Sequence, residues 1–328
     1  MERYEHAVES PGRTAQMTNA ASAVRGHSNE FRYYIFGLYL GLLNLLRNGM
    51  RLGLMKTIGK ITQPINSYTR FPEYYLMDEA IQSFSRSKKD SELLRILDVG
   101  SPKCFGLYLA SKLELEIEMT DINSLNIDEY KTMWEAVRPH ARGRAHFALE
   151  DARSLSYPAN HFDVVYSMSV LEHIEGQAGD RDGLREMARV LKPGGLLLLS
   201  VPFGGEYVEQ QRKGLAHAVE KKSGGSLYFF QRIYDIRAIE RRIFPALGGL
   251  SVRAEWTVWR ERELPVRLFK SLGEYLGGAL GFLNPWLSLW SNRYGSGIVE
   301  AVSGSYGQIY STQDSYGDFV LAAQKGCK

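Results

Sequence analysis

Three short segments of the chain are apolar without regular polar alternation, at residues 96–99, 162–167 and 196–201. Strands of a parallel sheet have this pattern because helices cover both of their faces. Two further strands are expected at residues 115–120 and, near the end of the chain, at residues 318–324. These segments predict a sheet that is largely parallel and buried.

The pattern changes from strand to helix between the last two of the three apolar segments. Over residues 182–191 the apolar side chains recur at helical spacing, at Leu184, Met187, Val190 and Leu191. The turn formers of residues 192–195 (KPGG) then stop the helix. A helix that returns the chain to a parallel strand is the repeating unit of a doubly wound α/β fold.

Both ends of the chain carry additions to this core. Residues 1–30 are polar and lack the apolar stretch of a secretory signal, so we expect a disordered tail. An apolar run then begins at residue 31, but its uncharged part, residues 33–46, is shorter than the ~20 residues that span a bilayer. A second apolar segment covers residues 272–290. The two segments are expected to form either a lid over the active site or amphipathic elements on a membrane surface.

Residues suited to ligand chemistry gather where the predicted strands end. The strand at residues 96–99 contains Asp98 and stops at Gly100, and Asp121 closes the next strand 21 residues after that glycine. In doubly wound folds, an acid ~20 residues beyond the glycine turn meets the ribose hydroxyls of a nucleotide cofactor. The two acids therefore predict a nucleoside-binding edge of the sheet.

The turn after Gly100 helps to decide which cofactor binds there. A dinucleotide needs the pattern G-x-G-x-x-G, so that the backbone can approach a pyrophosphate, whereas Ser101, Pro102 and Lys103 follow here. Asp98 would repel a pyrophosphate but suits a ligand that has an ammonium and a sulfonium group. S-adenosylmethionine fits this description.

Five segments together resemble the class I S-adenosylmethionine-dependent methyltransferases of the small-molecule type (type 11-like). The resemblance covers about residues 94–202, and the segments follow the family's order and spacing. It implies a doubly wound, seven-stranded Rossmann-like α/β sheet with helical additions, and a cofactor across the ends of the first, second and fourth strands. The segments are residues 96–100 (ILDVG), 119–122 (MTDI), 149–153 (LEDAR), 162–174 (FDVVYSMSVLEHI) and 185–195 (REMARVLKPGG).

The resemblance also implies a set of cofactor-binding residues at the strand ends. They are Asp98, Gly100 and Ser101 for the methionine end, Asp121 and Ile122 for the ribose and adenine, Asp151 and Ala152 for the adenine edge, and Met168 at the fourth strand. Capping of the following helix is the alternative role of Asp121. Pro102 has no backbone N–H, and Lys103 brings positive charge near a cationic donor. We therefore expect this turn to hold the cofactor differently from the family's glycine-rich version.

His173 is the candidate catalytic base. It follows the fourth strand, and an unperturbed histidine pKa of ~6.5 suits proton removal near neutrality. Orientation of the acceptor, or a loop hydrogen bond, are the alternative roles. Glu172 and His173 also resemble part of the metal-binding Glu-x-x-Glu-His of quinone-type O-methyltransferases, but Ser169 replaces the first acid. We therefore predict no metal site.

Charge and cysteine content narrow the classes of partner. The 40 basic and 37 acidic residues give a net charge of +3, which is too balanced for a dedicated nucleic-acid binder. The two cysteines, Cys104 and Cys327, form neither a disulfide framework nor a C-x-x-C metal pattern. A reducing, cytoplasmic setting is expected, with peripheral membrane contact as an open alternative.

The expected organisation is one core with additions: a tail at residues 1–30, a helical addition at 31–75, a methyltransferase core at 76–264, an apolar insertion at 265–313, and a final strand at 314–328. The predicted function is methyl transfer from S-adenosylmethionine to an apolar or lipid-linked small molecule. One alternative is a non-catalytic binding or scaffold protein that kept the fold. A nicotinamide-dependent dehydrogenase is a third hypothesis.

Overall fold

The computed structural model describes residues 31–48, 70–88, 93–213, 227–248, 250–261, 299–305 and 317–326. The tail expected at residues 1–30 and the apolar segment at residues 272–290 lie outside these described residues.

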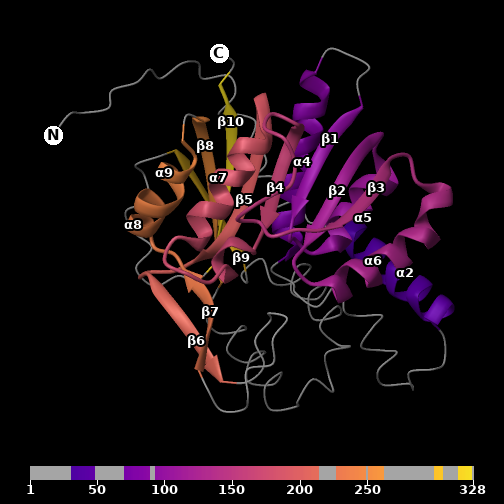
Figure 1. Cartoon of the computed structure of the whole chain (residues 1–328), viewed down its shortest axis with the longest axis horizontal. Helices are drawn as coiled ribbons and strands as arrows, with labels where there is room; N and C mark the ends of the chain where they lie inside the picture. The colour runs from indigo at the N-terminus through magenta and orange to yellow at the C-terminus, as the bar shows by residue number, and fades with distance from the viewer. Residues whose placement is uncertain are drawn as a thin grey trace.

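The described part of the chain is organised around one sheet (Figure 1), whose eight strands have the order β3-β2-β1-β4-β5-β10-β8-β9. β1 to β5 are mutually parallel, whereas β10 is antiparallel to both β5 and β8. The α/β, mainly parallel sheet predicted from the apolar segments is thereby confirmed. The strands are β1 Leu94–Val99, β2 Leu115–Asp121, β3 Arg144–Leu149, β4 Phe162–Met168, β5 Leu191–Phe203, β8 Leu250–Glu261, β9 Val299–Ser305 and β10 Gly317–Lys325.

The number of strands corrects the expected seven. The additional strand is β9, which pairs antiparallel with β8 from Glu255↔Ser305 to Glu261↔Val299. β9 lies within residues 265–313, where the sequence indicated only an apolar insertion. The edge of β8 would otherwise offer unpaired backbone N–H and C=O groups, and a strand satisfies them.

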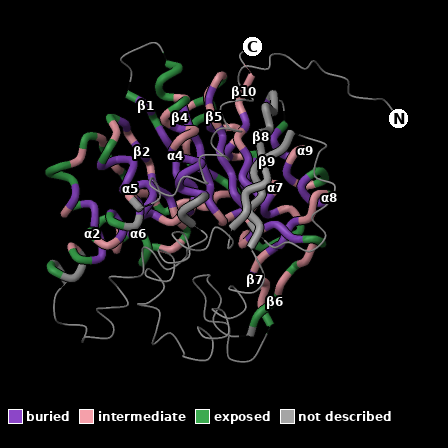
Figure 2. The backbone as a smooth tube through the Cα atoms, turned by 180° about the vertical axis from the view of Figure 1, so that it is seen from behind, coloured by how far each residue is buried: buried purple, intermediate pink, exposed green. Residues whose placement is uncertain are grey.

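Helices cover the two faces of the sheet. The first face carries α2, α4, α5 and α6, which share one apolar cluster with β1, β2 and β4. The second face carries α7 and the short helices after β7, which share another cluster with β4, β5 and β10. Figure 2 shows the buried residues running through the central strands between these layers. The helices are α2 Phe31–Asn48, α4 Arg70–Ser87, α5 Lys103–Lys112, α6 Ser124–Val137, η3 Arg138–His140, η4 Leu171–His173, α7 Gly179–Val190, α8 Ile236–Ala238, η5 Ile239–Ile243 and α9 Phe244–Ala246.

Alternation along β4 explains why this strand shows no polar pattern. Val164 and Tyr166 belong to the cluster under α4 and α5, whereas Val165, between them, belongs to the cluster under α7. All three side chains are fully buried. A strand covered on both faces buries successive residues on opposite sides, so each position is apolar or a partnered polar group.

α2, which lies within the helical addition expected at residues 31–75, packs on the first face of the sheet. Tyr33 of α2 contacts the rings of Tyr74 in α4 and of Tyr108 in α5. Its hydroxyl donates to Asp78 over 2.7 Å, and Arg32 pairs with the same carboxylate. Aromatic packing and a buried hydrogen bond therefore join α2 to α4 and α5.

α2 also has a second apolar face that the described residues do not cover. Ile35, Tyr39, Leu42 and Leu46 are all exposed, by 40% to 71%. Their spacing of four, three and four residues places them on one stripe of the helix. No helix in the described ranges is both long enough and apolar enough to cross a membrane.

A two-stranded hairpin, β6 Val208–Lys213 and β7 Leu227–Ile233, follows β5. It extends beyond the carboxyl end of β5, at the lower left of Figure 1. β7 returns next to η4, and the chain then forms the short helices of the second face. The hairpin therefore brings a separate piece of backbone to the edge where the predicted site lies.

Candidate functional site at the carboxyl ends of the parallel strands

The loops after β1, β3 and β4 are fixed to their neighbours by backbone hydrogen bonds. Gly100 N donates to Thr120 O, Glu150 N donates to Asp121 O, and Ser169 N donates to Ser200 O, each over 3.0 Å. Parallel strands place their carboxyl ends at one edge, so these bonds hold the predicted site residues along that edge.

The turn after β1 requires a glycine at its first position. Gly100 has φ +70°, a left-handed conformation that other residues rarely adopt. A Cβ atom there would lie 2.7 Å from Cγ1 of Val170, in the loop after β4. The close approach of the two loops therefore depends on Gly100.

Asp98 and Lys103 form a buried ion pair inside this turn. Lys103 Nζ lies 3.5 Å from Asp98 Oδ1 and donates to Ser101 O over 2.7 Å, and Ser101 N also donates to Asp98 Oδ1. The side chains of Asp98 and Lys103 are 0% and 1% exposed. Burial raises the pKa of Asp98, and the positive charge of Lys103 opposes that rise.

Ser101 and Met168, both predicted to contact the cofactor, are buried and contact each other. Ser101 Oγ accepts a hydrogen bond from Met168 N over 2.9 Å, and both residues are buried. Met168 belongs to the apolar cluster on the α5 side of the sheet. These contacts join the ends of β1 and β4 and leave Gly100 and Pro102 as the half-buried residues of the turn.

The predicted nucleoside end is more open. Asp121, at the end of β2, is half-buried, and the Ile122 side chain beside it is 55% exposed. Asp121 Oδ1 accepts from Asn123 N over 2.9 Å, and Oδ2 accepts from the Asn126 side chain over 3.1 Å. Asn123, rather than Asp121, is the N-cap of α6. Asp121 therefore organises the turn into α6 while its carboxylate stays at the accessible edge.

Asp151 is held by its neighbour Arg153. The Arg153 side chain contacts both oxygens of this carboxylate over 2.6–3.1 Å. The hydrogen bonds from Arg153 lower the pKa of Asp151 below its ordinary value, so the carboxylate is ionised at neutral pH. Ala152, the other residue predicted at the adenine edge, is half-buried between them.

His173 lies in η4, directly after β4, and its ring is oriented by β7. Its Nδ1 lies 2.7 Å from the carbonyl oxygen of Phe230. A carbonyl only accepts hydrogen bonds, so in the neutral imidazole Nδ1 carries the proton and Nε2 is the basic nitrogen. Nε2 lies 3.6 Å from Oε1 of the buried Glu172.

Arg232 fixes β7 against the loop that carries His173. Its guanidinium donates to Ile174 O over 2.7 Å and to Gly176 O, and the side chain is 1% exposed. The same group lies over the Phe229 ring, 4.7 Å from its centroid. β7 and the loop after η4 therefore meet at a buried guanidinium, two residues from Phe230.

A carboxylate from α4 reaches the position where the metal-binding pattern lacks its first acid. Ser169 Oγ donates to Oε1 of the buried Glu73 over 3.2 Å. Glu73 thus joins Ser169, Glu172 and His173 at the end of β4. Within the described ranges, however, no group of three or more His, Cys, Asp or Glu side chains could hold a metal ion.

Several of these contacts carry no sequence signal. Glu73 lies in a helix with no motif, and Phe230 acts through its backbone carbonyl. The sequence shows that Lys103 brings a charge into the turn, but the burial of this charge against Asp98 depends on the fold of the turn.

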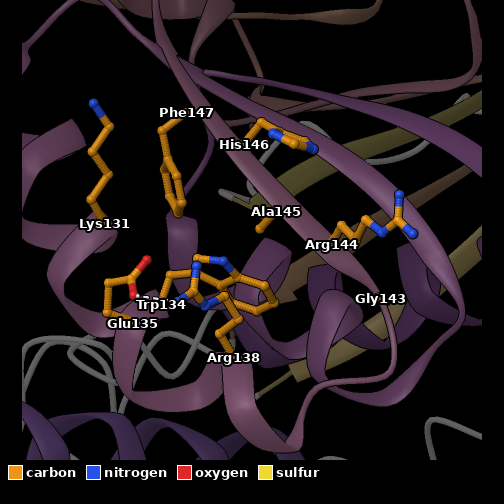
Figure 3. Close-up of a pocket in the computed structure, with 9 residues that line it drawn as sticks. All are labelled: Lys131, Trp134, Glu135, Arg138, Gly143, Arg144, Ala145, His146 and Phe147. Atoms are coloured by element: carbon orange, nitrogen blue, oxygen red, sulfur yellow. Dashed lines mark ion pairs between the residues drawn. The ribbon is translucent and has the colours of Figure 1, made fainter.

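A surface pocket of about 470 Å³ lies elsewhere, between α6 and the edge strand β3. Figure 3 shows Trp134 and Phe147 among its lining, with Lys131, Arg138 and Arg144 around them. None of the predicted site residues lines it. It is therefore separate from the edge that carries the turn after β1.

Comparison with known proteins agrees with the geometry of that edge. Residues 97–199 match the family described as a methyltransferase domain. A ubiquinone/menaquinone biosynthesis C-methyltransferase from Ectopseudomonas mendocina is 37% identical over 86 residues, which are 26% of this chain and 31% of that protein. A ubiquinone biosynthesis O-methyltransferase from Chelativorans sp. is 28% identical over 148 residues, or 42% of this chain and 53% of that protein.

A phosphoethanolamine N-methyltransferase from Triticum aestivum is 30% identical over 151 residues, or 44% of this chain and 25% of that protein. The chain thus spans between a quarter and about half of the length of these three relatives. A solved methyltransferase from Methanosarcina mazei covers 76% of this chain and 98% of its own, at 20% identity and a TM-score of 0.44.

The residues present fit S-adenosylmethionine at one end better than at the other. The nucleoside end offers the accessible edge of Asp121 and the exposed Ile122. At the methionine end, Asp98 is already paired with Lys103 inside the protein. Residues 97–199 thus match the methyltransferase-domain family, and the mainly parallel order of their strands agrees with that match.

Proposed function

We propose that the protein is an S-adenosylmethionine-dependent methyltransferase that acts on an apolar or lipid-linked small molecule, with His173 as the general base. The orientation of His173 carries this proposal. Its Nδ1 is engaged by the Phe230 carbonyl, and its Nε2 is the nitrogen that takes up a proton. The residue ends η4, in the connection after β4, at the edge that carries the turn after β1.

Removal of a proton from the acceptor is the task of the protein's own residues. S-adenosylmethionine, when bound, supplies an already activated methyl group on a sulfonium. His173 Nε2 accepts the proton that a hydroxyl or similar acceptor loses, and Glu172 Oε1, 3.6 Å away, stabilises the resulting imidazolium. The β7 backbone holds the ring, since Phe230 O remains hydrogen-bonded to Nδ1 in both protonation states.

The apolar nature of the acceptor is supported by α2. The stripe of Ile35, Tyr39, Leu42 and Leu46 exposes apolar surface on a helix joined to α4 and α5. Some relatives are named for ubiquinone or menaquinone biosynthesis and for methylation of 2-methyl-6-phytyl-1,4-hydroquinone. Such acceptors would match the apolar surface that this stripe exposes.

Peripheral membrane contact is part of the same proposal. The sequence places Arg47, Arg51, Lys56 and Lys60 on and after the helix that carries the stripe. Apolar residues combined with basic ones are typical of helices that lie on anionic membrane surfaces. A cytoplasmic protein that binds such a surface would reach an acceptor that resides in the membrane.

Two measurements test the methyltransferase proposal. S-adenosylmethionine should bind the full chain in a calorimetric titration, and mass spectrometry of lipid extracts should reveal a product heavier by one CH₂ unit. His173→Ala should retain cofactor binding and lose turnover by about 10²- to 10⁴-fold, the usual contribution of a general base. His140→Ala is the matched control, since His140 is exposed in η3. Full turnover of His173→Ala would eliminate the base role.

Membrane contact is tested separately, by co-sedimentation with vesicles that contain phosphatidylserine. The variant Leu42→Glu/Leu46→Glu changes two exposed side chains of the stripe and should reduce sedimentation several-fold. Leu125→Glu is the control, because Leu125 is exposed on α6, outside the stripe. Equal, negligible binding of the unchanged protein and of both variants would refute the membrane contact and leave the catalytic proposal unaffected.

The buried Asp98–Lys103 pair favours a second candidate function. A binding or scaffold protein that kept the fold and lost the donor site would also tolerate a turn in which Asp98 and Lys103 are buried against each other. Its signature is millimolar or absent S-adenosylmethionine binding in the same titration.

A further inference from the structure

Lys103 is an unusual residue for the position it occupies. It is the first residue of α5, and its side chain is 1% exposed. A helix N-terminus carries partial positive charge, so a lysine there is unfavourable on its own. Removing an ammonium from water costs several kcal/mol unless it is paired and hydrogen-bonded. The position of Lys103 therefore requires the partners that hold it.

Those partners are supplied by the turn itself. Lys103 Nζ donates to Ser101 O over 2.7 Å and lies 3.5 Å from Asp98 Oδ1. Pro102, between them, has φ −57° and ψ 112°, which leads directly into the first turn of α5. Proline has a fixed φ and no backbone N–H. This turn is therefore held by the Lys103 ammonium, where a glycine-rich turn would offer backbone N–H groups.

Asp98 has no surface left for a ligand. Asp98 is 0% exposed, and its Oδ1 accepts hydrogen bonds from Ser101 N and from Lys103 Nζ. Oδ2 is buried as well, and the buried hydroxyl of Tyr166 in β4 interacts with this carboxylate. The carboxylate thus faces the interior of the protein, with Lys103 as its counter-ion.

We infer that Lys103 stands in for the ammonium of the donor, so that Asp98 does not hold the methionine end of the cofactor in this protein. This inference rests on the proposed function, because it concerns how the same site binds S-adenosylmethionine and its product. The donor site then recognises mainly the nucleoside, at Asp121 and Ile122. It distinguishes only weakly between ligands with and without an amino-acid end.

Two ligands measure this specificity directly. S-adenosylhomocysteine has the amino-acid end, whereas 5′-methylthioadenosine has the same nucleoside and a thioether but lacks that end. In the unchanged protein, the Kd values of the two ligands should differ by less than about tenfold. A hydrogen bond between Asp98 and the ligand ammonium would instead contribute a factor of about 10 to 100 or more.

Two variants separate the roles of Lys103 and Asp98. Lys103→Ala should increase the preference for S-adenosylhomocysteine by about tenfold, because Asp98 becomes available to the ligand ammonium. Asp98→Asn/Lys103→Met removes both charges at similar size, and both ligands should bind within about threefold of the unchanged protein. The second variant keeps the test valid if Lys103→Ala does not fold. Lys112→Ala is the control, since Lys112 is exposed at the end of α5.

The outcomes distinguish this inference from the proposed function. Calorimetry that shows a preference for S-adenosylhomocysteine of about tenfold or more in the unchanged protein would overturn the inference and leave the function standing. The same holds if Asp98→Asn/Lys103→Met selectively loses that ligand. Absence of binding of both ligands to every protein in the set would overturn the inference and the proposed function together.

Discussion

The central prediction concerns Asp180, the buried anion that joins α7 to the strand beside His173. Asp180 is 0% exposed. It accepts a hydrogen bond from the Tyr234 hydroxyl over 2.9 Å and two from the Arg242 guanidinium over 2.8 Å each. Arg232 Nε lies 4.0 Å away. The carboxylate therefore compensates one buried and one largely buried arginine.

Replacement of Asp180 by Asn keeps the shape of the side chain and removes its charge. The buried Arg232 and the 17% exposed Arg242 would then lack their shared counter-ion. Removing one member of a buried ion pair costs about 3–5 kcal/mol, because the remaining charge stays uncompensated. This applies to Arg242, whereas Arg232 keeps Glu209 Oε1 at 3.4 Å from its Nε. We expect Asp180→Asn to lower the free energy of unfolding by that amount.

The assay is urea denaturation followed by circular dichroism, with the slope against urea concentration checked for constancy. Asp182→Asn is the matched control, since Asp182 lies two residues away on α7 and pairs with Arg185 over 2.7 Å at the exposed surface. An exposed pair of this kind contributes about 0–1 kcal/mol. A loss below about 1 kcal/mol for Asp180→Asn, equal to that of the control, would refute the reasoning.

The pH dependence of stability tests the same role of Asp180 independently. Burial alone would raise the pKa of Asp180, but the hydrogen bonds and charges of Arg242 and Arg232 lower it below its ordinary value. A lowered pKa in the folded state means that the unfolded chain binds this proton more readily. Its contribution is present above the unfolded pKa of ~3.9 and is lost as the pH falls through the folded value. Asp180→Asn should lack this part of the acid dependence.

Three further substitutions test the packing, each by the shift of the urea midpoint. Gly106→Ala would place a Cβ 2.6 Å from Met119 Sδ and should cost about 1–3 kcal/mol by overpacking; an unchanged midpoint would contradict that contact. Gly100→Ala forces a left-handed φ of 70° on alanine, at a cost of about 1–2 kcal/mol before the clash with Val170; tolerance would mean that the turn relaxes. Leu184→Ala removes a fully buried side chain of α7 and should cost about 2–5 kcal/mol; a loss below about 1 kcal/mol would show that the neighbouring side chains fill the cavity.

Much of the fold follows from local pattern. The apolar runs at residues 96–99, 162–167 and 196–201 lie within β1, β4 and β5, and the periodic segment at residues 182–191 lies largely within α7. Burial on both faces makes such runs recognisable without any knowledge of their neighbours. β9 was missed because a strand at an edge depends on what it pairs with, and pairing is not written in its own residues.

The candidate site was predictable only in part. The positions of Gly100, Asp121 and His173 at strand ends follow from the order of strands and turns. The partners of those residues do not, since the Phe230 carbonyl is 57 residues from His173 and Glu73 is 96 residues from Ser169. Contacts at such separations are set by packing, and a backbone carbonyl has no residue-type signature.

The sequence by itself determined a mainly parallel α/β sheet and the edge at which the predicted site residues lie, because strand burial and glycine turns are local properties of the chain. Only the tertiary structure decided what that edge contains. It buries Lys103 against Asp98, and it orients His173 through β7. Both outcomes depend on desolvation and on distance between charged or polar groups, and these quantities exist only once distant segments have packed together.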